Sequence, residues 1–77
     1  MKKILDILNE IRPEFDFASS ENFIEDGYLD SFDMVTLVSE LEEKYHILID
    51  ALDIVPENFC SLEAIAGVIK KNGGIVE

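Results

Sequence analysis

Apolar residues recur every three or four positions in three stretches of the chain, and this spacing predicts three amphipathic helices. In the first stretch, one buried helical face is expected to consist of Ile4, Ile7, Leu8 and Ile11. Pro13 should end this helix near Ile11 or Arg12, because the residue before a proline avoids the α-helical region. The two aromatic residues that follow, Phe15 and Phe17, are expected to fold back over the core.

A long loop over residues 18–30 is expected to lead into the second helix, which begins at Asp30 or Ser31 and ends near Tyr45. Its predicted buried stripe consists of Val35, Val38, Leu41 and Tyr45, with Met34 and Leu37 alongside. Asp30 suits the N-cap position, and Asp33 lies in the first turn, where the helix dipole favours negative charge.

The last third of the chain predicts a short helical turn and a third helix. Pro56 suits the first position of the short turn. Ser61 is expected to cap the third helix, which ends at Gly73-Gly74. The buried side of that helix is predicted to consist of Leu62, Ile65, Ala66 and Ile69. The apolar connector at residues 47–49 resembles a strand in composition, but no second strand is predicted with which it could pair.

The pattern therefore predicts one domain over residues 1–77 with an all-α fold, a small bundle of three main helices plus one short helix and a long first loop. A chain of 77 residues holds one modest core, so we expect no elaborate active site and no catalytic activity. Cys60 is the only cysteine, which excludes an intrachain disulfide and a thiolate metal cluster, and we expect it to be buried. His46, the only histidine, is expected at the end of the second helix, where the dipole favours it.

Acidic residues dominate the chain, since 17 Asp and Glu against 6 Lys and Arg give a net charge of −11. Residues 13–43 contain no Lys or Arg at all. Nucleic acid and anionic membrane surfaces both require a basic face, so neither is expected as a partner. A stretch of one sign favours a docking face for Lys- and Arg-rich partners. We expect no secretory segment and no membrane span, and hence a cytoplasmic protein, as a monomer.

The start of the second helix holds the candidate chemistry. A serine in the first helical turn exposes its hydroxyl beside backbone N–H groups that lack a helical partner. Those groups and the helix dipole favour the negative charge of a phosphate attached there. No base lies near Ser31 in the sequence, so we expect another enzyme to modify it, and a small hydrolase is set aside.

Three aspartates in this region, Asp26, Asp30 and Asp33, raise the question of a calcium site. An EF-hand loop with Gly27 at its sixth position would need an oxygen ligand at Ile24, which has none. We therefore expect no metal site.

The segment Asp30-Ser31-Phe32-Asp33-x-Val35 resembles the Asp-Ser-Leu motif of acyl carrier proteins and peptidyl carrier proteins. The resemblance extends over nearly the whole chain, because an amphipathic first helix, a long loop, the motif and a final helix follow in order. In that family the serine receives a 4′-phosphopantetheine arm from coenzyme A, and the arm's thiol bears an acyl or aminoacyl thioester. The resemblance thus implies a carrier protein of fatty acid, polyketide or nonribosomal peptide biosynthesis, with Ser31 as the attachment site.

The same resemblance implies partners and further site residues. The partners would be a phosphopantetheinyl transferase, a loading enzyme, and downstream synthases or transferases with basic docking patches. Asp30 matches the aspartate before the serine, whereas Asp33, Glu42 and Glu43 match acidic positions on the family's recognition helix. Phe32 stands at an apolar partner contact, and we expect it to be exposed because it lies off the predicted buried stripe.

The nature of the cargo stays open at this point among fatty acyl, polyketide, amino acid and D-alanyl groups. Thr36 and Lys44 stand where fatty-acid carriers usually have acids, and the link from Tyr45 to Leu62 is longer than in those carriers. In these features the chain is similar to D-alanyl carriers and to stand-alone carriers of peptide or specialised pathways. The alternative function is an unmodified acidic helical adaptor that binds a basic protein partner through its second helix.

Overall fold

The computed structural model describes residues 2–76, and every regular element in that range is a helix. The three α-helices are α1 (Lys2–Ile11), α2 (Ser31–Tyr45) and α3 (Leu62–Lys71). Short 3-10 helices lie in the connections: η1 (Phe17–Ser19) before α2, then η2 (Ala51–Asp53) and η3 (Pro56–Asn58) between α2 and α3. The predicted all-α bundle is confirmed, although the connections hold three short helices where one was expected.

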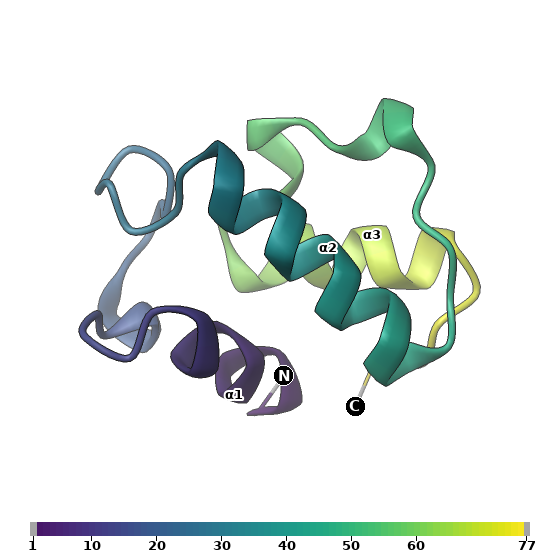
Figure 1. Ribbon diagram of the computed structural model, residues 1–77, viewed down its shortest axis with the longest axis horizontal. Coiled ribbons are helices and arrows are strands. Elements are labelled where there is room, and N and C mark those ends of the chain that lie inside the picture. The colour runs from purple at the N-terminus through teal and green to yellow at the C-terminus, as the bar shows by residue number, and fades with distance from the viewer. Residues whose placement is uncertain (1, 77) are drawn as a thin grey trace.

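The three helices surround a shared core. α1 packs against both α2 and α3, and Figure 1 shows α2 crossing in front of α3 with α1 below them. Local signals set the helix ends: α1 stops at Ile11, two residues before Pro13, and the Ser61 hydroxyl accepts a hydrogen bond from Ala64 N (3.1 Å). His46 ends α2 in the left-handed conformation (φ 55°), at the position expected for it. No helix within the described residues is long and apolar enough to cross a bilayer.

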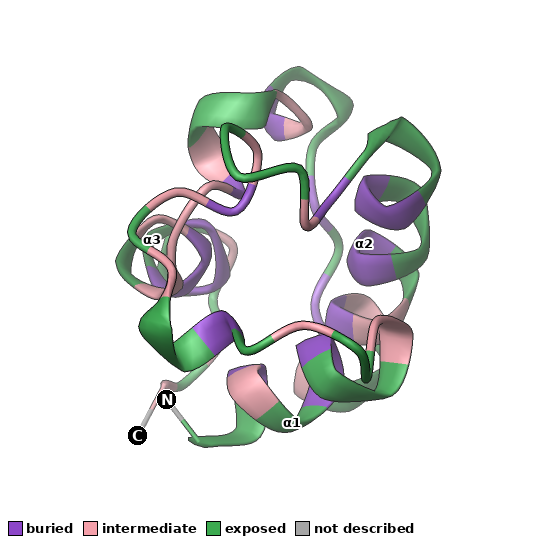
Figure 2. Cartoon of the chain, turned by 90° about the vertical axis from the view of Figure 1, so that its left-hand side faces the viewer, coloured by how far each residue is buried: buried purple, intermediate pink, exposed green. Residues whose placement is uncertain are grey.

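The core is filled by aliphatic residues from all three helices and by phenylalanines from the connections. Figure 2 shows the buried segments of the helices turned toward a common centre. The largest fully buried side chains are Phe17, Phe23, Phe59, Ile4, Leu8, Leu37, Leu41, Ile65 and Ile69. Phe17 enters the core as predicted, whereas Phe15 stays partly exposed and stacks on Tyr28 with 4.4 Å between ring centroids. The loop before α2 is thereby anchored by aromatic packing.

The buried face of α2 differs from the predicted stripe. It consists of Asp33, Met34, Leu37, Val38 and Leu41. Val35 was predicted to be buried, but 63% of it is exposed, and Tyr45 is only half-buried. At 100° per residue, Val35 stands about 160° around the helix from Leu37, so the two cannot face the same core. Val35 therefore belongs to the solvent face, together with Phe32.

The link between α2 and α3 is held by side chains at its start and near its middle. Ile47 and Ile49 are buried and Leu48 is exposed, yet no strand forms within the described residues, as predicted. The buried Asp53 carboxylate pairs with Lys71 on α3 (Oδ1–Nζ 2.8 Å). Cys60 was expected to be buried, but it is only half-buried, because it lies at the edge of the core beyond the fully buried Phe59.

Candidate functional site

The first turn of α2 is fixed by a reciprocal pair of hydrogen bonds. Asp30 is the N-cap residue, and its Oδ1 accepts from Asp33 N (2.9 Å). Asp33 returns the interaction, since its Oδ2 accepts from Asp30 N (3.2 Å). This capping box satisfies two backbone donors that the helix itself leaves unpaired. The helix therefore begins at Ser31, which is one of the two starting positions predicted from the sequence.

Ser31 occupies the first helical position and is exposed to solvent. Its backbone is held by the capping box, whereas its hydroxyl has no hydrogen-bond partner among residues 2–76. His46 lies 15 residues further on, about 22 Å along the helix axis, so it cannot act as a base toward Ser31. The hydroxyl is thus accessible to another molecule and is not activated by a neighbour in the described part of the chain.

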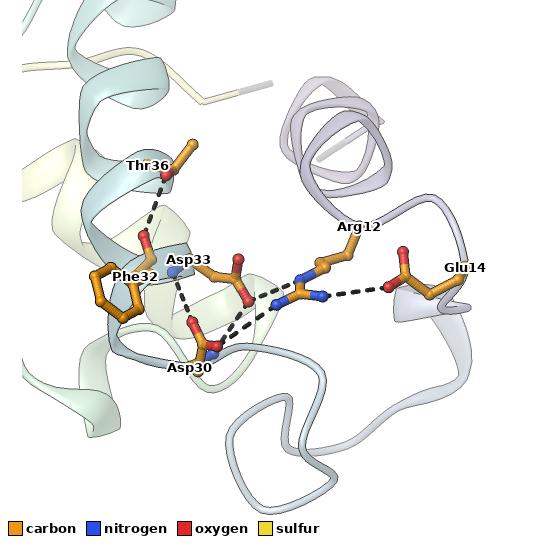
Figure 3. A network of polar contacts seen from close by, with 6 residues as sticks. All are labelled: Arg12, Glu14, Asp30, Phe32, Asp33 and Thr36. Atoms are coloured by element: carbon orange, nitrogen blue, oxygen red, sulfur yellow. Dashed lines mark hydrogen bonds and ion pairs between the residues drawn. The ribbon is translucent and has the colours of Figure 1, made fainter.

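Arg12, at the end of α1, reaches across to this turn and contacts three carboxylates (Figure 3). Its Nε donates to Asp33 Oδ2 (2.9 Å), and its Nη2 lies 3.5 Å from Asp30 Oδ2. Its Nη1 donates to Glu14 Oε2 (3.3 Å). One guanidinium therefore ties the end of α1 and the following loop to the beginning of α2.

The charged forms of these groups are favoured by their contacts. The pKa of Asp30 is lowered, chiefly because its carboxylate accepts the Asp33 N–H and also because Arg12 lies near it. The pKa of Arg12 is raised, first by its hydrogen bond with Asp33 and then by that with Glu14. The start of α2 therefore holds the ionised carboxylate of Asp30 close to the permanent cation of Arg12.

Arg12 was not identified as a site residue from the sequence. The only signal in the sequence was weak: Arg12 is the last basic residue before a stretch of 31 residues without Lys or Arg, residues 13–43. Its contact with Asp33 spans 21 residues and depends on how α1 packs against α2. Periodicity within one helix does not reveal such a long-range pair.

The acidic residues assigned to partner recognition lie in different environments. Asp33 is only 8% exposed and faces Arg12, so its carboxylate is used inside the molecule. Glu42 is half-buried, and its Oε2 accepts from Ile49 N (2.9 Å). Glu43 is exposed. Only Glu43 of these three presents a fully accessible charge to a partner.

The exposed face of α2 is neutral over its first two turns. Phe32 is 84% exposed, as expected, and Val35 lies beside it one turn along. The other exposed residues of these turns are Ser31 and Thr36, and the Thr36 hydroxyl donates to Phe32 O (3.1 Å). Along the helix, the apolar pair and the free Ser31 hydroxyl are thus followed by Ser39, by the half-buried Glu40 and then by the exposed charge of Glu43.

Comparisons with known proteins leave the site to be judged on its own geometry: no family model, curated protein or solved structure matches the chain. Within residues 2–76 no group of three or more acidic, histidine or cysteine side chains is placed to hold a metal ion. The arrangement offers an accessible hydroxyl at a helix N-terminus, an apolar contact beside it and a rigid backbone beneath it. These features leave the Ser31 hydroxyl open to modification by another molecule.

The lowered pKa of Asp30 predicts a dependence of stability on pH. Because the folded-state pKa lies below the usual value of 3.8, the contribution of Asp30 is complete above that pH and is lost as the pH falls through the folded-state pKa. Asp30→Asn keeps a good N-cap but removes this titration. We expect the melting temperature of the variant to fall less than that of the wild type between pH 5 and pH 2.5, which thermal unfolding followed by circular dichroism would measure.

Asp16→Asn is the matched control, because Asp16 precedes η1 without making a side-chain capping bond. We expect it to follow the wild type at every pH. A curve for Asp30→Asn that also coincides with the wild type would contradict the electrostatic role assigned to this cap.

Proposed function

We propose that the chain is a carrier protein in which Ser31 bears a 4′-phosphopantetheine arm. The arm's thiol would tether acyl or aminoacyl intermediates as thioesters and present them to partner enzymes in the cytoplasm. The observation that supports this most strongly is the exposed Ser31 hydroxyl, free of partners in the described chain, at the first position of a rigidly capped helix. The resemblance of residues 30–35 to the carrier motif points to the same chemistry.

The attachment reaction that fits Ser31 is a phosphoryl transfer. Its oxygen would attack the arm's phosphorus in coenzyme A, forming the serine O–P bond while the P–O bond to the departing adenosine 3′,5′-bisphosphate breaks. The serine proton is proposed to pass to a base on the transferase, since the Ser31 hydroxyl has no hydrogen-bond partner among the described residues and the neighbouring Asp30 carboxylate is engaged by Asp33 N and Arg12. The chain itself is proposed to act as a substrate and carrier, with no catalytic residue of its own.

The electrostatics of the site are compatible with the phosphate of the arm. A helix N-terminus favours negative charge, because its backbone N–H dipoles point outward. The carboxylates of Asp30 and Asp33 oppose a further negative group, and Arg12 offsets part of that repulsion at distances of 2.9 and 3.5 Å. We therefore propose that Arg12 reduces the repulsion between the Asp30 and Asp33 carboxylates and a phosphodiester on Ser31.

The exposed face of α2 is the proposed docking surface. Phe32 and Val35 offer an apolar contact beside Ser31, and Glu43 offers charge about 16 Å from Phe32 along the helix. A matching partner surface would have an apolar depression near its active site and Lys or Arg further away. The transferase and the loading enzyme are the proposed partners, each meeting a monomer of this chain.

The first test is covalent loading. We expect the wild type to gain one arm when it is incubated with coenzyme A and a broad-specificity phosphopantetheinyl transferase, and Ser31→Ala to gain none. Alanine is a good helix former and Asp30 still caps the helix, so the variant should keep its helical circular dichroism. Intact-mass spectrometry measures the gain.

Ser61→Ala is the matched control, because Ser61 also stands at the start of a helix. It should be loaded like the wild type even though the loss of its cap costs about 1 kcal/mol of stability. Loading of folded Ser31→Ala would place the site elsewhere. A wild type that is not loaded by several transferases would favour the adaptor function, which uses the same α2 face without modification.

The docking surface gives a second test. Phe32→Ala removes the apolar contact beside Ser31, and we expect the transferase kcat/KM to fall about tenfold, in line with the loss of roughly 1–2 kcal/mol at an interface anchor. Leu48→Ala is the control, since Leu48 is exposed to the same degree (83% against 84%) but lies beyond the other end of α2. Equal rates for the two variants would place the docking surface away from Phe32.

A further inference from the structure

A small pocket lies where the loop before α2 meets the segment that holds η3. Its lining consists of Asn22, Ile24, Glu25, Pro56, Glu57 and Cys60, and its volume is about 260 Å³. The loop is joined there to the residues just after η3 by a backbone hydrogen bond from Phe23 N to Cys60 O (2.7 Å). A pocket below the usual size of about 300–1,000 Å³ for drug-sized ligands suits a group of a few heavy atoms.

The lining combines half-buried apolar side chains with negatively charged ones. Ile24 and Cys60 are half-buried, whereas Glu25 and Glu57 are exposed and come from the two segments of the chain that meet at the pocket. The Asn22 side chain fixes the backbone on its side of the pocket, since its Oδ1 accepts hydrogen bonds from Ile24 N (3.1 Å) and Glu25 N (2.9 Å). No Lys or Arg is among the lining residues, so the group that complements this pocket is a small cation with an apolar part.

The pocket lies within reach of an arm attached to Ser31. Leu29 N donates to Phe23 O over 3.2 Å, and Ile24 is the next residue along the chain. With two Cα–Cα steps of about 3.8 Å from Ser31 to Leu29, the Ile24 backbone lies within about 15 Å of the Ser31 Cα. An arm of roughly fifteen bonds, extended like a polypeptide at three bonds per residue, spans about 17 Å.

We infer that this pocket receives the ammonium end of a short aminoacyl cargo, with the small side chain of the cargo against Ile24 and Cys60. The inference rests on the proposed function and narrows its cargo to the aminoacyl class. A fatty acyl or polyketide chain has no cation to place between Glu25 and Glu57, so it would leave both carboxylates without a counter-charge.

The test compares two cargos that differ chiefly by one amine. Amide-linked analogues of alanyl- and propionyl-coenzyme A are transferred to Ser31 of the ¹⁵N-labelled protein, and both loaded forms are checked by intact mass. We expect the backbone amides of residues 22–25 and 57–60 to shift in the alanyl form and to keep their positions in the propionyl form. The pKa of the alanyl amine should rise by about 0.3–0.7 unit relative to the free analogue, as expected for exposed ion pairs worth up to about 1 kcal/mol.

Glu25→Gln combined with Glu57→Gln should abolish both effects, whereas Glu21→Gln should leave them intact, because Glu21 is exposed in the same loop but does not line the pocket. Identical spectra of the alanyl and propionyl forms would overturn the inference and leave the carrier function standing. Failure of Ser31 to accept either analogue would overturn the carrier function itself.

Discussion

The interaction on which the rest of the site depends is the ionised contact of Arg12 with the capping box of α2. Asp33 is almost completely buried, and burial of a carboxylate without a partner would cost several kcal/mol. Here the carboxylate accepts from Arg12 Nε and from Asp30 N, so its burial is compensated. Two consequences follow. The start of α2 is fixed to the end of α1, and Ser31 is placed on a turn whose backbone has little freedom.

Because some acidic side chains make contacts inside the molecule, the net charge does not by itself describe the surface of α2. The net charge of −11 suggests a uniformly acidic docking helix, yet the first two turns of α2 expose only neutral side chains. Asp33 forms an ion pair with Arg12, and the half-buried Glu42 carboxylate accepts a hydrogen bond from Ile49 N. A partner proposed to approach Ser31 would thus meet Phe32 and the exposed carboxylate of Asp30 beside the serine, and the next fully exposed acidic side chain on α2 is Glu43. Under the proposed function, apolar contact at Phe32 and charge pairing near Glu43 would be separate requirements on the partner.

Local sequence signals predicted the helices well, because each helix end depends on a nearby residue. Pro13 stops α1 and Ser61 caps α3, both through interactions that span only a few positions. Prediction failed where packing decided the outcome. Val35 was placed in the core by a spacing that also fits the solvent face, and the partner of Asp33 was invisible because Arg12 lies 21 residues away. The pocket between the first loop and η3 likewise depends on contacts between segments that are distant in sequence.

The most direct measurement is the location of the arm on the unmutated chain. After incubation with coenzyme A and a phosphopantetheinyl transferase, fragmentation mass spectrometry should assign a single arm to Ser31 and none to the other four serines, Ser19, Ser20, Ser39 and Ser61. Only Ser31 combines exposure with the first position of the capped α2 helix. An arm on another serine, or no arm with any transferase, would contradict the proposal that Ser31 bears the arm.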